Sequence, residues 1–262
     1  MKCVIVLILL SLCGRVAYAQ SALPTAFGTP AARTSYPGQA WLEEGNYSPS
    51  EASVLTTSYI EQGVTIGHVF GLSLAPFGSF GISADTKGYD WENRSAIRAG
   101  AKVSKVFSHG IVEVSTGYSL EDRFKSGLQR GGLTSYADYW FGWSNIGGGG
   151  RFPGSSYGLV GNVSPVEHNN MLSALHVEQG VVAKRFGKIA VVPFGETTVS
   201  RDTAGFQWNN RNIGGAGLKV VIPTPHAQFQ LGGDYLNEVR FNGLSAAGYG
   251  LFLKFWSGWG RR

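Results

Sequence analysis

The residues best suited to acid–base chemistry are five histidines. His109 and His226 fall in short links between predicted strands, where turn or interface roles are expected. His176 lies two residues before Glu178, so both side chains point to the same face of an extended strand. A hydrolase needs a nucleophile beside such a base, and no distinctive Ser/His spacing indicates one. We predict no catalytic residues, no cofactor and no metal site, with a lipid-active membrane hydrolase or acyltransferase as the less favoured alternative.

Charged side chains recur at matching places in the two halves of the chain. Four pairs of positions lie 117 residues apart: Glu61 with Glu178, Lys102 with Lys219, Glu113 with Gln230, and Glu121 with Glu238. They could form rings of alternating charge that line a pore and grade solutes, or cross-strand ion pairs that fill a narrow lumen. Both interpretations stay open. The predicted lumen-lining residues are Glu61, Arg98, Lys102, Glu113, Glu121, Asp138, Glu178, Glu196, Lys219, Asp234, Glu238 and Lys254.

A polar pattern, Asp-Thr-x-Gly-aromatic-x-Trp-x-Asn-Arg, occurs at 85–94 and again at 202–211. Tryptophan and asparagine suit stacking and hydrogen bonding to a sugar, so these loops could form an extracellular receptor rim. We favour the simpler interpretation of loops held by local Asx-type hydrogen bonds, with the tryptophans at the membrane interface. The rim residues are Asp85, Trp91, Asn93, Arg94, Asp202, Trp208, Asn210 and Arg211.

These matches belong to one internal repeat. A shift of 117 residues places 58–124 on 175–241 without a gap and gives 23 identities in 67 positions. One-residue slips extend it at both ends, so that repeat 1 is 37–143, the linker is 144–152 and repeat 2 is 153–259. Each repeat is expected to form six strands, near 38–47, 55–69, 71–84, 95–106, 110–121 and 132–143 in the first. The repeat therefore indicates a duplicated six-strand unit.

Apolar residues alternate with glycine, serine and charged residues along these strands. A soluble sandwich or lipocalin-like barrel would place the apolar face inside, whereas a membrane barrel places it outside. Mixed charges suit a wet lumen, and aromatic residues near strand ends, from Tyr136 to Trp143 and from Tyr249 to Trp259, suit interfacial girdles. We predict an all-β fold: a transmembrane antiparallel up-and-down β-barrel of about 12 strands, built from two six-strand repeats.

The amino terminus reads as a secretion signal. Lys2, an apolar run over 4–12 and Ala17-Tyr18-Ala19 predict a signal peptide at 1–19, followed by an N-terminal extension at 20–36 and a single barrel domain at 37–262. Cleavage would remove both cysteines, Cys3 and Cys13. The expected location is the outer membrane of a Gram-negative bacterium, with the lipid bilayer, lipopolysaccharide and the barrel-assembly machinery as partners. The net charge of +5 is modest and no segment resembles a nucleic-acid-binding patch, so no nucleic-acid partner is expected.

Short motifs in the second repeat carry a family resemblance. Glu178-Gln179-Gly180, Pro193-Phe194-Gly195 and the loop from Arg201 to Asn210 resemble the C-terminal β-barrel of outer-membrane proteins for exopolysaccharide export and phage adsorption, over about half the chain. The resemblance implies polysaccharide passage or a receptor role, with a polysaccharide export system as partner. The first hypothesis is a passive channel or export accessory for a saccharide or small polar solute. The alternative is a non-conducting structural or receptor barrel.

Overall fold

The computed structural model describes residues 35–144, 146–167 and 169–260. The predicted signal peptide and almost all of the predicted N-terminal extension lie outside these ranges. The strands of the described residues are β1 (Gly38–Gly45), β2 (Leu55–Gly63), β3 (Gly67–Val69), β4 (Leu72–Asp85), β5 (Arg94–Phe107), β6 (Gly110–Arg123), β7 (Leu128–Trp143), β8 (Gly154–Asn162), β9 (Leu172–Gly180), β10 (Lys184–Phe186), β11 (Ile189–Asp202), β12 (Arg211–Pro223), β13 (Ala227–Arg240) and β14 (Ser245–Trp259).

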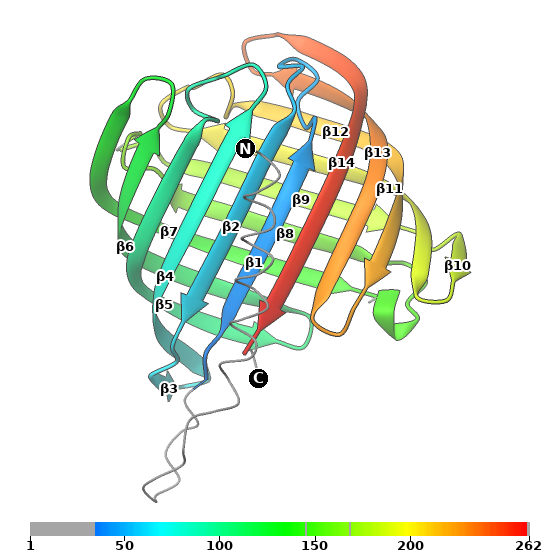
Figure 1. Cartoon of the computed structure of the whole chain (residues 1–262), viewed down its shortest axis with the longest axis horizontal. Helices are drawn as coiled ribbons and strands as arrows, with labels where there is room; N and C mark the ends of the chain where they lie inside the picture. Colours follow the sequence, from blue (N-terminus) through cyan, green and yellow to red (C-terminus); the bar gives the residue numbers. More distant parts are fainter. Residues whose placement is uncertain (1–34, 145, 168, 261–262) are drawn as a thin grey trace, which may run out of the picture. The chain divides into compact units, whose positions relative to one another are not determined.

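The strands close into a single antiparallel ring. Each long strand pairs with its neighbours along the chain, β1 pairs with β14, and β9 pairs with β11. The three-residue strands β3 and β10 only extend the wall beside β4 and β11, so the ring has twelve strands. In Figure 1 the near-wall strands β2, β1 and β14 cross the far-wall strands β8 and β9 at a steep angle, as tilted strands do in a barrel. The predicted antiparallel β-barrel of about 12 strands is confirmed.

The strand bounds follow the offset of the sequence repeat. β2, β3, β4 and β6 of the first half become β9, β10, β11 and β13 of the second when 117 is added to their residue numbers. The strand expected at 55–69 is interrupted at 64–66, which separates β2 from β3. The one expected at 132–143 begins earlier, at Leu128. Both halves therefore build the same six-strand unit.

The two faces of the wall differ as a membrane requires. Along β6, Val112, Val114 and Leu120 are exposed, whereas the alternate residues Glu113 and Glu121 are buried. Exposed apolar side chains continue around the ring, including Tyr249 at 83% and Leu251 at 78% exposure. A water-soluble barrel would turn these residues inward. The exposed apolar face of this barrel is therefore the face that contacts lipid.

Apart from the linker between the repeats, the connections tend to be shorter at one end of the barrel than at the other. At one end, links such as 70–71 and 187–188 have two residues; at the other, loops such as 86–93 and 203–210 have eight. Short periplasmic turns and longer external loops are typical of outer-membrane barrels, so we place the long loops outside. No helix in the described residues is long and apolar enough to cross a membrane.

The linker between the repeats packs into the barrel end. It contains a one-turn 3₁₀ helix, η2 (Ile146–Gly148), and Ile146 is buried against Ala190, Val192 and Val221. The Arg185 guanidinium donates hydrogen bonds to the carbonyls of Ile146 and Gly150. The expected linker is therefore an ordered part of the periplasmic end.

The prediction that all aromatic residues near the strand ends belong to interfacial girdles is wrong for some of them. Trp143 and Trp259 lie outside, where their indole N–H groups donate to Gln179 and Gln62 at 2.9 Å. Tyr136, Trp140, Phe252 and Trp256 share the inner face with residues such as Glu113 and Lys254. Side chains alternate along a strand, so half of a run of aromatic residues must point inward.

Candidate functional site

The first lumenal cluster surrounds Lys102. Its ammonium lies 2.5 Å from Glu61 Oε1 and 3.0 Å from Glu113 Oε1, which joins β2, β5 and β6. Lys102 and Glu61 are each 4% exposed, and Glu113 is 7% exposed. These three predicted lumen residues therefore form a buried ion-pair cluster.

The second cluster repeats the first on the opposite wall. Lys219 lies 2.5 Å from Glu178 Oε1 and 2.9 Å from the side-chain oxygen of Gln230. Gln230 stands where the first half has Glu113, so the second half replaces one ion pair with a neutral hydrogen bond. Neither cluster is a ring around the lumen; each lies along one side of the wall.

Two further ion-pair groups fasten loops to the wall at the extracellular end. Glu238 accepts hydrogen bonds from Ser48 and Ser50, and Arg240 pairs with Glu51 at 2.7 Å. In the other half Glu121 accepts from Ser164, and Arg123 pairs with Glu167 at 2.9 Å. Sequence reasoning missed the loop partners Ser48, Glu51, Ser164 and Glu167, although the repeated Gly-Asn-x-Ser-Pro-x-Glu could have identified them.

The remaining predicted lumen residues also lie on the inner face. The Arg98 guanidinium bonds to Thr134 and Ser115 and lies 4.4 Å from the centre of the Tyr136 ring. Asp138 is the register partner of Glu113. Lys254 stands over the Tyr47 ring at 5.5 Å. Glu196 and Asp234 belong to a group on the second-half wall, described below.

The rim loops are held by their own aspartates. Asp85 accepts hydrogen bonds from the backbone N–H groups of Gly88 and Tyr89 and from the side chain of Asn93. Asp202 does the same with Gly205, Phe206 and Asn210. Arg94 contacts Glu121, and Arg211 contacts Glu51 and Glu238. The loops thus have the Asx-type geometry of the favoured interpretation.

The rim tryptophans meet across the mouth rather than lying in the membrane interface. Trp91 and Trp208 stack with ring centres 4.4 Å apart and 5° between their planes. Tyr89 covers the outer side of Trp91, and Phe206 covers that of Trp208. Their loops arise from opposite walls of the ring, and the two tryptophans are equivalent residues of the repeat. Residues that contact their own counterparts lie on the two-fold axis relating the halves, so this row of four rings crosses the extracellular mouth at the axis.

A second pair of equivalent tryptophans crosses the lumen near the other end. Trp140 on β7 and Trp256 on β14 stack at 6.1 Å from opposite sides of the ring. They remain 44% and 43% exposed, and the inward Tyr157 is 47% exposed. Free space therefore borders these rings inside the barrel.

A cleft of 450 Å³ opens beside the extracellular row. It is lined by Glu51 and Arg240 on one side and by Tyr89, Trp91 and Trp208 on the other, with Gln207 at its edge. Cavities of this size hold small ligands. Aromatic edges next to an ion pair suit a small ligand with both apolar and polar groups.

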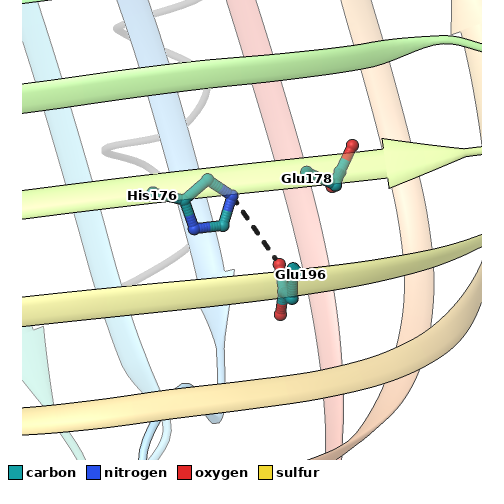
Figure 2. Close-up of side chains that lie close together, drawn as sticks. All are labelled: His176, Glu178 and Glu196. Atoms are coloured by element: carbon teal, nitrogen blue, oxygen red, sulfur yellow. Dashed lines mark ion pairs between the residues drawn. The ribbon is translucent and has the colours of Figure 1, made fainter.

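His176, Glu178 and Glu196 come together on the second-half wall (Figure 2). Their ligand atoms lie within 4.8 Å of one another, and His176 Nε2 is 3.8 Å from Glu196 Oε2. The sequence-based prediction of no metal site considered only the spacing of residues along the chain. It missed this group because β9 and β11 bring together residues twenty positions apart.

Besides Glu196, the described residues place a hydroxyl group and an aromatic ring against the His176 side chain. Its Nδ1 contacts the Thr198 hydroxyl at 2.9 Å, and its ring stacks on Tyr157 at 4.7 Å. Gly154–Gly158 matches the Gly-x-Ser-x-Gly consensus, but these residues lie in β8 rather than in a strand-to-helix turn. Ser156 there contacts the Tyr139 hydroxyl. The motif therefore supplies no nucleophile to the histidine.

Glu92 is expected to make the stability of the extracellular loop depend on pH. Burial, then the nearby Glu51 and Asp85 carboxylates, raise the pKa of Glu92 to about 8. A raised carboxyl pKa favours the folded loop below the ordinary pKa of 4.5, and this contribution is lost as the pH rises through about 8. We expect trypsin to cut at Lys87 faster above pH 8 in the wild type than in Glu92→Gln. If the ratio of the wild-type cleavage rate to the Glu92→Gln cleavage rate stayed constant from pH 6 to 9, the role of Glu92 would be contradicted.

A closed antiparallel barrel with lipid-facing apolar residues and a charged lumen defines an outer-membrane β-barrel. No family model and no curated protein sequence matches the chain. Among solved structures it is similar to an outer membrane channel from Pseudomonas putida F1, at 8% identity and a TM-score of 0.44, over 91% of this chain and 100% of that one.

Two further solved structures are similar over most of their length. The β domain of the Bordetella autotransporter Brka matches at 12% identity and a TM-score of 0.37, over 86% of this chain and 99% of that one. A bacterial polysaccharide outer membrane secretin matches at 11% identity and a TM-score of 0.36, over 87% and 98%. At these values no function is carried over from them.

Proposed function

We propose that the protein is a non-conducting outer-membrane barrel that works as a structural or receptor protein through its extracellular face. The observation that carries this proposal is the pairing of the lumenal charges. Lys102, Glu61 and Glu113 satisfy one another at 4–7% exposure, and Glu121 and Glu238 are bound to loop residues at 3% and 1%. A charge ring that selects solutes has to face the water it filters.

The aromatic rings that cross the two mouths, the four at the extracellular mouth and the Trp140–Trp256 pair, form two rows of rings. These rows support the same function. The four stacked rings at the extracellular mouth and the Trp140–Trp256 pair both lie across the solute path. The 450 Å³ cleft lies beside the extracellular row, where a ligand can be bound without entering the barrel. A small saccharide is the ligand class that aromatic edges with neighbouring Glu51 and Arg240 suit best.

The second candidate is a gated passive channel for a saccharide or small polar solute, or an accessory of a polysaccharide export system. It is favoured by the exposed inner surfaces of Trp140, Trp256 and Tyr157, which border free space inside the barrel. The barriers at the two mouths consist of side chains, and those at the extracellular mouth stand on loops of eight residues. Movement of either row would join this space to the exterior.

Conductance in planar lipid bilayers separates the two candidates. For the non-conducting barrel we expect no unitary current from the refolded wild type, and none after alanine replaces Trp91, Trp208, Trp140 and Trp256 together. A general porin reconstituted in the same way provides the control. Steps from the wild type would overturn the proposal, and steps from the four-alanine variant alone would show that the rings, and not the paired charges, block the lumen.

A further inference from the structure

The two halves differ at three neighbouring positions of the lumenal wall. At the 117-residue offset the second half has His176 for Tyr59, Glu196 for Ser79 and Asp234 for Gly117. The shared residues around them, Glu178 and Lys219, keep the same ion pair as their first-half counterparts. The second half therefore places an imidazole and two carboxylates where the first half has a phenol, a hydroxyl and a glycine, while the Glu–Lys pair beside them is kept.

The geometry around His176 resembles that of a metal-binding histidine. The residue is 6% exposed, and its Nδ1 contacts the Thr198 hydroxyl at 2.9 Å. Its other ring nitrogen, Nε2, is directed at Glu196 (Figure 2). Metal-ligating histidines usually have one ring nitrogen fixed by a second hydrogen-bond partner in this way.

A buried carboxylate next to this group has one oxygen without a well-formed hydrogen bond. Asp234 is 6% exposed, and the Gly250 backbone and the Glu196 side chain both approach its carboxylate, but its Oδ1 makes no hydrogen bond of ordinary geometry. Gly250 opposite it leaves the space, because a Cβ there would lie 2.6 Å from that oxygen. An unpaired buried oxygen costs free energy, and a bound cation would remove that cost.

The local charge also favours a cation. Four carboxylates, Glu43, Glu178, Glu196 and Asp234, surround the ammonium groups of Lys254 and Lys219. With all six groups ionised, two negative charges remain uncompensated. A divalent cation would neutralise them.

We propose that the lumen binds one divalent transition-metal ion of the Zn²⁺ class between β9 and β11. His176 Nε2 and one oxygen each from Glu178 and Glu196 are the ligands, and Asp234 is the neighbouring carboxylate available as a fourth. Zinc takes histidine nitrogen and carboxylate oxygen, whereas calcium and magnesium prefer oxygen alone. Glu178 can keep Lys219 on Oε1 and offer its second oxygen, and small side-chain rotations would bring the ligand atoms within bonding distance.

The first half provides the matched variant. His176→Tyr with Glu196→Ser gives the second-half wall the residues that the first half already accommodates, and His226→Asn changes a histidine in the link between β12 and β13 as the control. Full-length protein is refolded in detergent, checked by its heat-modifiable migration, and titrated with Zn²⁺ against a chromophoric chelator. Zinc is supplied both during and after refolding, because the rows of rings lie across both mouths.

We expect one zinc ion per barrel in the wild type and in His226→Asn, and more than about 100-fold weaker binding in the double variant, since even outer-shell substitutions weaken metal binding by 10–100-fold. Co²⁺ should give visible absorption bands that the double variant lacks. Should the double variant fail to refold, His176→Gln replaces it with the same expectation. No stoichiometric zinc in the wild type, or equal affinity in the folded variant, would overturn the proposal.

Discussion

Replacing Lys102 by methionine is expected to lower the free energy of unfolding by about 3–5 kcal/mol, the cost of removing one partner from a buried ion pair. The substitution keeps the length of the side chain but leaves the carboxylates of Glu61 and Glu113 without a cation. Urea unfolding of the barrel in lipid vesicles, followed by tryptophan fluorescence, measures the change.

Two controls isolate the buried charge. Lys105→Met removes an exposed lysine from the same strand and should change stability by less than about 0.5 kcal/mol. Combining Lys102→Met with Glu61→Gln and Glu113→Gln should recover most of the loss, because the uncompensated charges disappear. A loss below about 1 kcal/mol for Lys102→Met, as for exposed pairs, would mean that water fills the lumen at this level and would favour the channel.

The wall of the barrel could be predicted from the sequence because strand periodicity and the repeat are local signals. Alternation places Glu113 and Val114 on opposite faces, and the repeat then assigns the same faces to Gln230 and Leu231. An even number of strands also allows β1 to pair with β14, so that closure follows from the count. The inward position of the lumenal charges follows from the same rule.

Contacts across the lumen could not be predicted in this way. Periodicity says which way Trp140 points, but not that it reaches Trp256 on the opposite wall. The group of His176 and Glu196 depends on the register between β9 and β11, which the spacing along the chain does not contain. The partners of Glu238 and Arg240 lie in the loop between β1 and β2, almost two hundred residues earlier.

Comparison of the halves recovers part of what periodicity misses. Trp91 with Trp208 and Trp140 with Trp256 are equivalent positions, and large equivalent side chains that point inward are candidates to meet on the axis. Positions at which the halves differ show instead where the chemistry of the wall has changed. Where Tyr59 becomes His176, the framework is kept and only the chemistry changes.

The orientation of the whole wall can be tested from the lipid side. Leu251 lies near the middle of β14 with 78% of its surface exposed, and its neighbours Tyr249 and Leu253 point the same way. Leu251→Arg should lower the free energy of unfolding in bilayers by about 2–4 kcal/mol, the cost of a basic side chain at the bilayer midplane. Urea unfolding in vesicles measures the loss.

Asn237→Arg provides the depth control for that substitution. Asn237 also faces outward, but it lies near the extracellular end of β13, where arginine should cost only about 0–1 kcal/mol. A large difference between the two variants shows that acyl chains cover the middle of the outer face. If Leu251→Arg lowered the free energy of unfolding as little as Asn237→Arg, the Val, Leu and Tyr face would be in contact with water. Both the assignment of a polar lumen and the assignment to a membrane would then be wrong.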